Sequence, residues 1–201
     1  MNTWGNETNQ ARNVTDMDQV NKQAPTEVVK NRVYFYSPVN KENALSLNSK
    51  LRATANILLM EQKALGLESP IPIYLHISSY GGVIFDGLSA MDEVKNSPVP
   101  VYTVIDGCCA SAATFMSVAG KKRFINRHSF ILIHQIISAF WGTNQEFEDH
   151  VKNMRKFMKI MKGVYREHTK ISMKKLDEIL KHDLWFDANE ALKLGLVDEI
   201  I

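Results

Sequence analysis

Short apolar runs alternate with stretches of helical periodicity along most of this chain. The apolar runs are rich in Val, Ile, Phe and Tyr, as buried strands are, and they occupy residues 32–36, 71–77, 99–105, 123–126 and 130–134. Between and after these runs, helical spacing of apolar residues predicts helices over residues 41–64, 84–95, 112–119, 143–168, 172–181 and 188–193. Strands that alternate with helices indicate an α/β fold built on a mostly parallel sheet.

The composition is that of one globular domain preceded by a polar arm. The 201 residues are 45% hydrophobic and 23% charged, which suffices for one sizeable core. Residues 1–30 are polar, rich in Asn and aperiodic, so we expect a flexible arm there and a single domain over residues 31–201. The net charge of +2 predicts neither a nucleic-acid partner nor attachment to a membrane surface.

Cysteine usage and the N-terminal sequence indicate a cytoplasmic protein. Cys108 and Cys109 are adjacent, and neighbouring cysteines seldom bridge, so a disulfide-stapled secreted fold is not expected. The first thirty residues contain no apolar signal segment, and the stretch 130–140 is too short to span a bilayer. No pair of histidines has metal-ligand spacing, so we expect no metal site.

Ser111 stands between the predicted strand 99–105 and the predicted helix 112–119. A serine at such a turn can present its hydroxyl at a helix N-terminus, where the dipole and free N–H groups favour negative charge. An ordinary helix cap is the simpler explanation of this serine taken alone. Cys109 and Ala113 also stand where a Gly-x-Ser-x-Gly nucleophile elbow has glycines.

His134 and an aspartate are candidates for the other groups of a nucleophilic-serine site. His134 ends the predicted strand 130–134 and could take a proton from Ser111, although a hydrogen-bonded core histidine is the plain alternative. Asp187 has capping-box spacing to Glu190, which gives it a structural task. Asp183 has no evident local role, so it is the better candidate to orient His134, unless it is a solvated loop residue.

Gly81 and Gly82 follow the predicted strand 71–77, where a tight turn alone would explain them. They also allow close backbone approach, and the N–H of Gly82 could form an oxyanion hole together with the N–H of Ala112. The two glycines, Ser111 and His134 all follow strands of the predicted sheet. Ligands of α/β sheets bind at the carboxyl ends of strands, so this shared placement indicates a site.

The predicted helix 143–168 carries an apolar stripe. The stripe comprises Phe147, Val151, Met154, Met158, Met161 and Tyr165, at spacings of three and four. A stripe of this kind either covers the core of its own subunit or packs on a partner subunit. Its methionines suit a contact between subunits.

Together these segments resemble the proteolytic subunit of the Clp protease, ClpP. The resemblance covers about residues 32–201, and the matching motifs lie at residues 78–84, 107–115, 131–135 and 195–198. It implies that Ser111, His134 and Asp183 form a catalytic triad, with Gly82 and Ala112 as oxyanion donors. It places Gly81, Gln135 and Ile136 beside the substrate.

The resemblance also implies the fold and the assembly. The expected fold is the ClpP/crotonase-type spiral, with helix 143–168 as a protruding handle that joins two stacked seven-membered rings. Such a homo-oligomer is a serine endopeptidase that hydrolyses unfolded polypeptides in an enclosed chamber and is fed by a Clp-type AAA+ ATPase. The subunit itself then needs no cofactor.

Several positions depart from the pattern of this family. Tyr80 and Ile136 each replace a usual proline near the substrate, so the peptide preference is expected to differ. His76 and Asn96 are polar where the pocket for the ATPase loop is usually apolar, and His182 stands in place of a usual arginine. Such divergence suits a phage or plastid-like branch, located in the cytoplasm of an infected cell or in the plastid stroma, or an accessory subunit.

Two other functions remain open on sequence grounds. A crotonase-class acyl-CoA enzyme shares the fold and the paired N–H donors, and fold alone does not decide between chemistries. A non-catalytic ring subunit could modulate an active partner. The presence of a serine, a histidine and an aspartate together favours the peptidase, because crotonases need no serine nucleophile.

Overall fold

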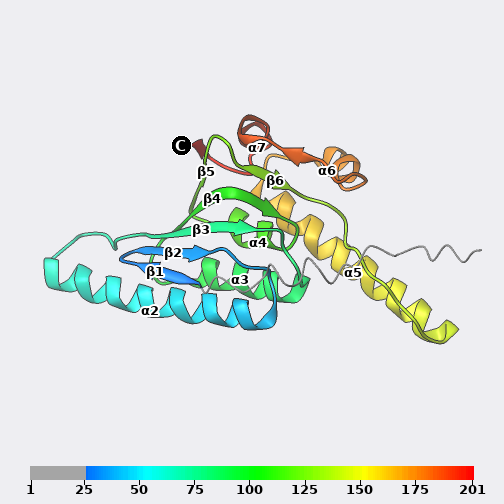
Figure 1. Cartoon of the computed structure of the whole chain (residues 1–201), viewed down its shortest axis with the longest axis horizontal. Coiled ribbons are helices and arrows are strands. Elements are labelled where there is room, and N and C mark those ends of the chain that lie inside the picture. Colours follow the sequence, from blue (N-terminus) through cyan, green and yellow to red (C-terminus); the bar gives the residue numbers. More distant parts are fainter. Residues whose placement is uncertain (1–25) are drawn as a thin grey trace, which may run out of the picture.

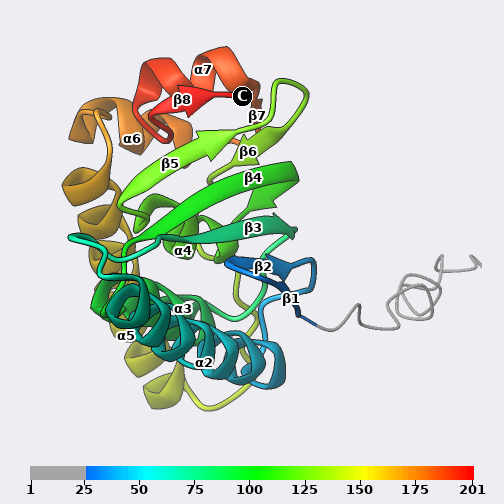
Figure 2. The same cartoon turned by 90° about the vertical axis from the view of Figure 1, so that its left-hand side faces the viewer.

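The computed structural model describes residues 26–201, and its centre is a twisted sheet (Figure 1, Figure 2). Its main path runs in the order β1-β2-β3-β4-β5-β8, with β6 and β7 attached beyond β4. The strands are β1 (Glu27–Val29), β2 (Arg32–Phe35), β3 (Ile73–Ser79), β4 (Val101–Ala110), β5 (Lys122–Ile125), β6 (Phe130–Leu132), β7 (Trp185–Phe186) and β8 (Glu199–Ile200). The pairs β1–β2 and β6–β7 are antiparallel and the other pairs are parallel, which confirms the predicted mostly parallel sheet.

Six helices connect these strands within residues 26–201. They are α2 (Lys41–Leu65), α3 (Ile84–Asn96), α4 (Ala113–Val118), α5 (Asn144–His168), α6 (Met173–Ile179) and α7 (Ala188–Leu194). Each lies within a few residues of a predicted helix, because the apolar faces are regular enough to mark them. None of these helices combines the length and the hydrophobicity that crossing a bilayer requires.

Strand β1 lies in the stretch predicted to be a flexible arm, so the domain begins earlier than residue 31. It pairs with β2 through a tight turn in which Lys30 has a φ of 55°. Hairpin turns that need positive φ usually contain glycine or asparagine at that place, and a lysine gives no such signal. The remainder of the predicted arm, residues 1–25, lies outside the described residues.

The core forms between one face of the sheet and the helices packed on it. Ile73, Leu75 and Ile77 alternate along β3 and are completely buried, as are Leu47 and, almost completely, Leu51 on α2. Every second side chain of a strand lies on the same face of the sheet, so this face of β3 packs against the core. Burial of such apolar area is the main stabilising contribution to the fold.

Strand β4 changes its partner halfway along. Up to Ile105 it pairs with β5, and from Cys108 onward it pairs with β6. The register with β3 shifts at the same place, between Ile77 and Ser79. In the bend, Gly107 has a φ of 76°, which glycine adopts without steric cost. The bend therefore separates a first half that builds the sheet from a second half that leads to the site.

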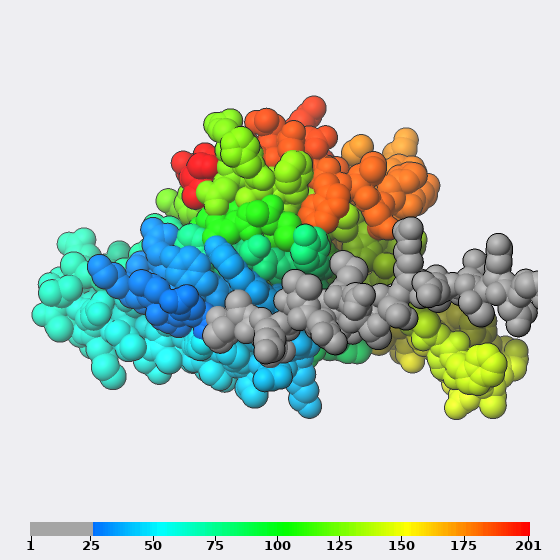
Figure 3. Space-filling view, in the orientation of Figure 1, coloured from blue at the N-terminus to red at the C-terminus, as the bar shows by residue number. Residues whose placement is uncertain are grey.

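Helix α5 projects from the body of the protein (Figure 1, Figure 3). Thr143 and Glu146 form a capping box at its start, which fixes where the helix begins. Of the predicted stripe, Met161 and Tyr165 are buried in the core, whereas Phe147 near the free end is 54% exposed. The stripe thus covers the core of its own subunit at one end, whereas at the other end Phe147 stays largely exposed although its ring meets that of Phe140 at 6.3 Å.

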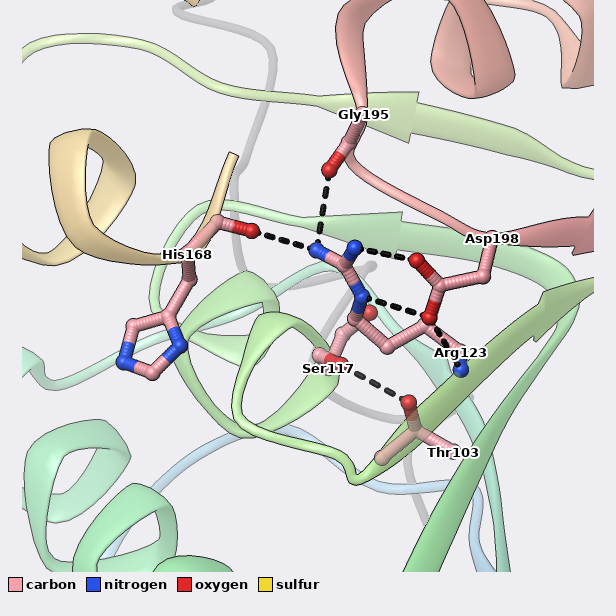
Figure 4. Close-up of polar contacts among 6 residues, drawn as sticks. All are labelled: Thr103, Ser117, Arg123, His168, Gly195 and Asp198. Atoms are coloured by element: carbon pink, nitrogen blue, oxygen red, sulfur yellow. Dashed lines mark hydrogen bonds and ion pairs between the residues drawn. The ribbon is translucent and has the colours of Figure 1, made fainter. Parts of the chain in front are cut away.

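Arg123 of β5 fastens the C-terminal end of α5 to the last part of the chain (Figure 4). Its guanidinium donates to the carbonyl oxygens of His168 and Gly195 and forms an ion pair with the carboxylate of Asp198. The hydrogen bonds from Arg123 hold the pKa of Asp198 below its usual value, against the opposing effect of burial. The carboxylate is therefore ionised at neutral pH, and the projecting helix has a fixed base.

Candidate active site

Ser111 occupies the turn between β4 and α4 in a strained conformation. Strand β4 continues to Ala110, beyond the predicted end at residue 105, so Ser111 directly follows the strand. Its φ of 54° is in the left-handed region, which non-glycine residues seldom adopt. The Ser111 N–H donates to the carbonyl of Leu132 at 2.9 Å, which joins the turn to β6. Strain held by such bonds is characteristic of functional turns.

Thr114 and Tyr165 hold the other side of this turn. The carbonyl oxygen of Ser111 accepts hydrogen bonds from the N–H of Thr114 at 3.0 Å and from its hydroxyl at 2.6 Å. The Thr114 hydroxyl has one hydrogen, so it must accept from the Tyr165 hydroxyl, 2.6 Å away. Burial raises the pKa of Tyr165, which keeps this donor protonated. A chain of hydrogen bonds therefore links α5 to the backbone of Ser111.

The loop after β3 lies directly against the serine turn. A Cβ at Gly81 would stand 2.6 Å from both the Ala110 carbonyl oxygen and the Cβ of Ser111, so only glycine fits there. The loop is fastened to Val39, which donates to the carbonyl of Gly81 and accepts from the N–H of Val83. Those bonds use the peptide groups on either side of Gly82, so the N–H of Gly82 points away from Val39.

His134 lies just beyond the end of β6, two residues after Leu132. Its Nδ1 is 3.8 Å from the Oδ1 of Asp183, an ion-pair distance that is too long for a hydrogen bond. This Nδ1 is buried and has no hydrogen-bond partner within residues 26–201. The Asp183 side chain is 74% exposed, so a small movement of its segment would close the contact.

Asp187 does not take part in this contact. It caps α7, where its carboxylate accepts from the N–H of Glu190 at 2.8 Å and the Glu190 carboxylate accepts from the N–H of Asp187 at 3.1 Å. The predicted capping box is confirmed. Of the two aspartates weighed from the sequence, Asp183 is the one beside His134.

One cavity of about 440 Å³ collects most of the predicted site residues. Its lining includes Ser111, Ala112, His134, Gln135, Ile136 and Gly82. Gly81 and Asp183 do not belong to this lining. The apolar part of its lining includes Phe85 and Phe157, whose rings meet edge to face at 5.0 Å. The predicted nucleophile, the predicted base, the two residues predicted to supply backbone donors and an apolar recess thus lie at one cavity.

Thr114 and Tyr165 are site residues that the sequence did not indicate. They are far apart along the chain, and Tyr165 was accounted for as one member of an apolar stripe. Only the fold brings its hydroxyl under the serine turn. No local pattern in the sequence marks such a long-range polar contact.

Removing this hydroxyl is expected to destabilise the protein and to slow any reaction at Ser111. Tyr165→Phe leaves the Thr114 hydroxyl without its buried donor, so the free energy of unfolding should fall by about 1–2 kcal/mol. Denaturant unfolding of Tyr165→Phe, Thr114→Val and the double variant measures the coupling. Strictly additive effects would show that the two hydroxyls act independently.

Known proteins resemble this chain in sequence and in fold. The family model of the Clp protease matches residues 16–201. The ATP-dependent Clp protease proteolytic subunit 2 of Treponema pallidum (strain Nichols) is 33% identical over 132 residues, which span 65% of this chain and 66% of that protein. A mutant of ClpP1 from Listeria monocytogenes superposes with a TM-score of 0.73 at 26% identity, covering 86% of this chain and 91% of that one.

The structural match confirms the predicted ClpP/crotonase-type fold, and its extent covers most of the described domain. The family match covers the serine turn, the histidine segment and the projecting helix alike. This chain therefore belongs to the Clp protease family, as a protein of the type of its proteolytic subunit.

Proposed function

We propose that this protein is a serine endopeptidase subunit that hydrolyses unfolded polypeptides inside a chamber of stacked rings. The observation that carries the proposal is the strained Ser111 at the head of α4, on the same cavity as His134. Family membership supports a peptidase, and the geometry supports Ser111 as its nucleophile.

In the proposed reaction, His134 accepts the proton of Ser111 while the serine oxygen attacks the substrate carbonyl. The N–H groups of Gly82 and Ala112 stabilise the oxyanion that develops. His134 then donates its proton to the leaving amine, and water repeats the sequence on the acyl-enzyme. Asp183 orients His134 once its segment has moved to within hydrogen-bond distance of Nδ1.

The cavity also accounts for substrate binding. An apolar side chain next to the scissile bond fits the apolar recess that Phe85 and Phe157 line. Gln135 and Ile136 follow His134 without a sheet partner within residues 26–201, and the Ile136 N–H makes only a long contact of 3.5 Å to the sulfur of Met158. A substrate strand can therefore pair with this segment and with the glycine loop. Backbone pairing of this kind suits unfolded chains of varied sequence.

We further infer that the subunit forms rings that stack through α5. At the free end of that helix, Phe147 and the preceding Trp141 are exposed, and apolar side chains of this kind are stabilised by burial against another subunit. Two stacked heptameric rings would place the cavity of every subunit on a shared chamber. Native mass spectrometry across micromolar concentrations would contradict this inference if it showed monomer alone.

A Clp-type ATPase is the proposed partner at the outer face of the sheet. This face carries an aromatic cluster made of Tyr34, Tyr74, Tyr102 and Phe124. His76 lies within it, stacked on Tyr34 and hydrogen-bonded to Arg32 and Asp106 at 2.8 and 2.7 Å. The aromatic surface suits an apolar loop of the ATPase. The polar hydrogen-bond network of His76 restricts binding to loops that can accommodate polar groups at that place.

Labelling with a serine-reactive fluorophosphonate tests the proposed chemistry. We expect one label per chain, on Ser111, with peptide hydrolysis lost in proportion to labelling. Denatured protein is the control and should not react. An acyl-CoA enzyme of the crotonase class, or a non-catalytic ring subunit, would bind no label at this position, and either result would refute the peptidase.

Asp183 and Asp187 are expected to separate activity from stability. Asp183→Ala should reduce peptide hydrolysis by several orders of magnitude, since His134 then has no orienting acid. Asp187→Ala should leave the rate nearly unchanged and lower the free energy of unfolding by about 1 kcal/mol, because it removes a helix cap. The reverse pattern in paired kinetic and unfolding measurements would contradict the assignment.

A further inference from the structure

A second apolar cavity lies beside the candidate active site. It measures about 380 Å³ and is lined by Tyr80, Cys108, Phe130 and Trp185. Phe130 and Trp185 have no ionisable group, and burial raises the pKa of the Cys108 thiol, which keeps it protonated at neutral pH. The cavity is therefore an aromatic recess with an uncharged floor.

Strand pairing fixes the shape of this recess. Cys108 and Phe130 are direct neighbours across β4 and β6, so they form its base. Trp185 sits on β7, opposite Leu132 of β6. Tyr80 leans over from the glycine loop, and its ring meets that of Trp185 edge to face at 6.2 Å. Three strands and one loop thus hold four side chains in one place.

The aromatic rings of the recess are open to solvent. Tyr80 is 78% exposed, Phe130 44% and Trp185 40%. Large apolar side chains gathered at an exposed cavity are typical of binding surfaces, since single apolar residues on a surface are ordinary but clusters are not. Tyr and Trp also supply wide contact areas with little loss of side-chain freedom.

The recess is continuous with the candidate active site through one residue. Tyr80 lines both this cavity and the larger one that contains Ser111 and His134. The other walls come from β4, β6 and β7, and of these strands β6 lies next to His134 and β7 next to Asp183. A general acid must reach the leaving amine, so the side of the site that carries His134 faces the leaving group.

We propose that Tyr80, Cys108, Phe130 and Trp185 form a second side-chain subsite, which binds an aromatic or large aliphatic residue of the substrate on the leaving-group side of the scissile bond. The subsite rests on the proposed peptidase function and defines its substrate class. A polypeptide is then selected by two apolar residues, one on each side of the bond that is cut.

Matched fluorogenic peptides test the subsite by kinetics. The peptides differ only in carrying Phe or Ala at one position, scanned over the residues that follow the scissile bond. We expect a preference for Phe in kcat/KM of at least about tenfold at one position. Trp185→Ala and Phe130→Ala should each reduce that preference severalfold, while Leu184→Ala, which alters an exposed neighbour outside the recess, should retain it.

The kinetic test uses two variants, so it can still be carried out if one of them misfolds. If Trp185→Ala does not fold, Phe130→Ala carries the measurement, since the two side chains lie on different strands. The absence of a Phe preference at every scanned position would overturn the subsite, as would a preference that persists in the folded variants. If the peptides are still hydrolysed in that case, the proposed peptidase function stands and only the subsite is refuted.

A binding measurement makes the subsite testable without catalysis. Trp4→Phe and Trp141→Phe leave Trp185 as the one tryptophan of the chain. With Ser111→Ala added, the Phe peptide should shift the Trp185 emission to shorter wavelength, and the matched Ala peptide should not. The same shift in protein that keeps Ser111 but does not hydrolyse the peptide would support the subsite and refute the peptidase. Equal spectra with both peptides would refute the subsite.

Discussion

Ser111→Ala is expected to reduce peptide hydrolysis by at least about a thousandfold, the loss typical of removing a nucleophile from a serine triad. The change removes one oxygen and leaves the backbone contacts of the turn in place, because those use the N–H and carbonyl groups of residue 111. Folding and assembly should therefore persist. Steady-state hydrolysis of a fluorogenic peptide, measured alongside thermal unfolding and native mass, tests both statements.

Ser49→Ala is the matched control, since Ser49 is an exposed serine on α2 far from the cavity in the fold. It should hydrolyse peptides at the wild-type rate. If Ser111→Ala retained comparable activity, the nucleophile would be another group. A loss of activity accompanied by loss of folded protein would leave Ser111 with a structural role only.

Gly82→Ala is expected to abolish activity and to lower the free energy of unfolding by roughly 3 kcal/mol. An added Cβ would stand 2.1 Å from the carbonyl oxygen of Val39, and a backbone atom has no flexible end that can move aside. The φ of 148° adds further strain for any residue with a side chain. The loop must shift away from Val39, and the N–H proposed as an oxyanion donor moves with it.

Gly163→Ala on α5 is the contrasting substitution. A Cβ there meets nothing within 4 Å, and the residue lies in a helix, where alanine is favoured over glycine by about 0.5–1 kcal/mol. In chemical unfolding, the free energy of unfolding should rise for Gly163→Ala and fall for Gly82→Ala. Wild-type activity and stability in Gly82→Ala would mean that the loop has no fixed contact with Val39.

The sequence predicted the long helices well, because α2 and α5 repeat their apolar positions over many turns. It missed β1 and β7, whose few residues give no periodicity, and it ended β4 too early because residues 106–110 look like a turn. A strand that bends at Gly107 and changes its partner breaks the alternation on which the prediction depended. Propensity decides such short segments less than tertiary pairing does.

For the candidate site, the positions of Ser111 and His134 after strands of the sheet predicted that they lie together, and the resemblance to ClpP added Asp183. The structure brings Ser111 and His134 to one cavity, with Asp183 beside His134. The support beneath Ser111 could not be predicted in the same way. The Tyr165 hydroxyl reaches Thr114 only because α5 packs under α4, and that contact depends on the whole fold. Local patterns thus identify reactive side chains more readily than the groups that position them.

The bend in β4 also limits how the chain length can vary in related proteins. In the pairing of β3 with β4, Ile77 lies opposite Ile105 and Ser79 lies opposite Cys109. The stretch of β4 between these pairs is longer than that of β3, and the bend accommodates the extra residues. Side chains alternate between the two faces of a strand, and the loss or gain of one residue after the bend would reverse that alternation up to residue 111. The serine hydroxyl would then face away from the cavity. Insertions and deletions should therefore be tolerated in the surface turns of this protein but not between residues 105 and 111.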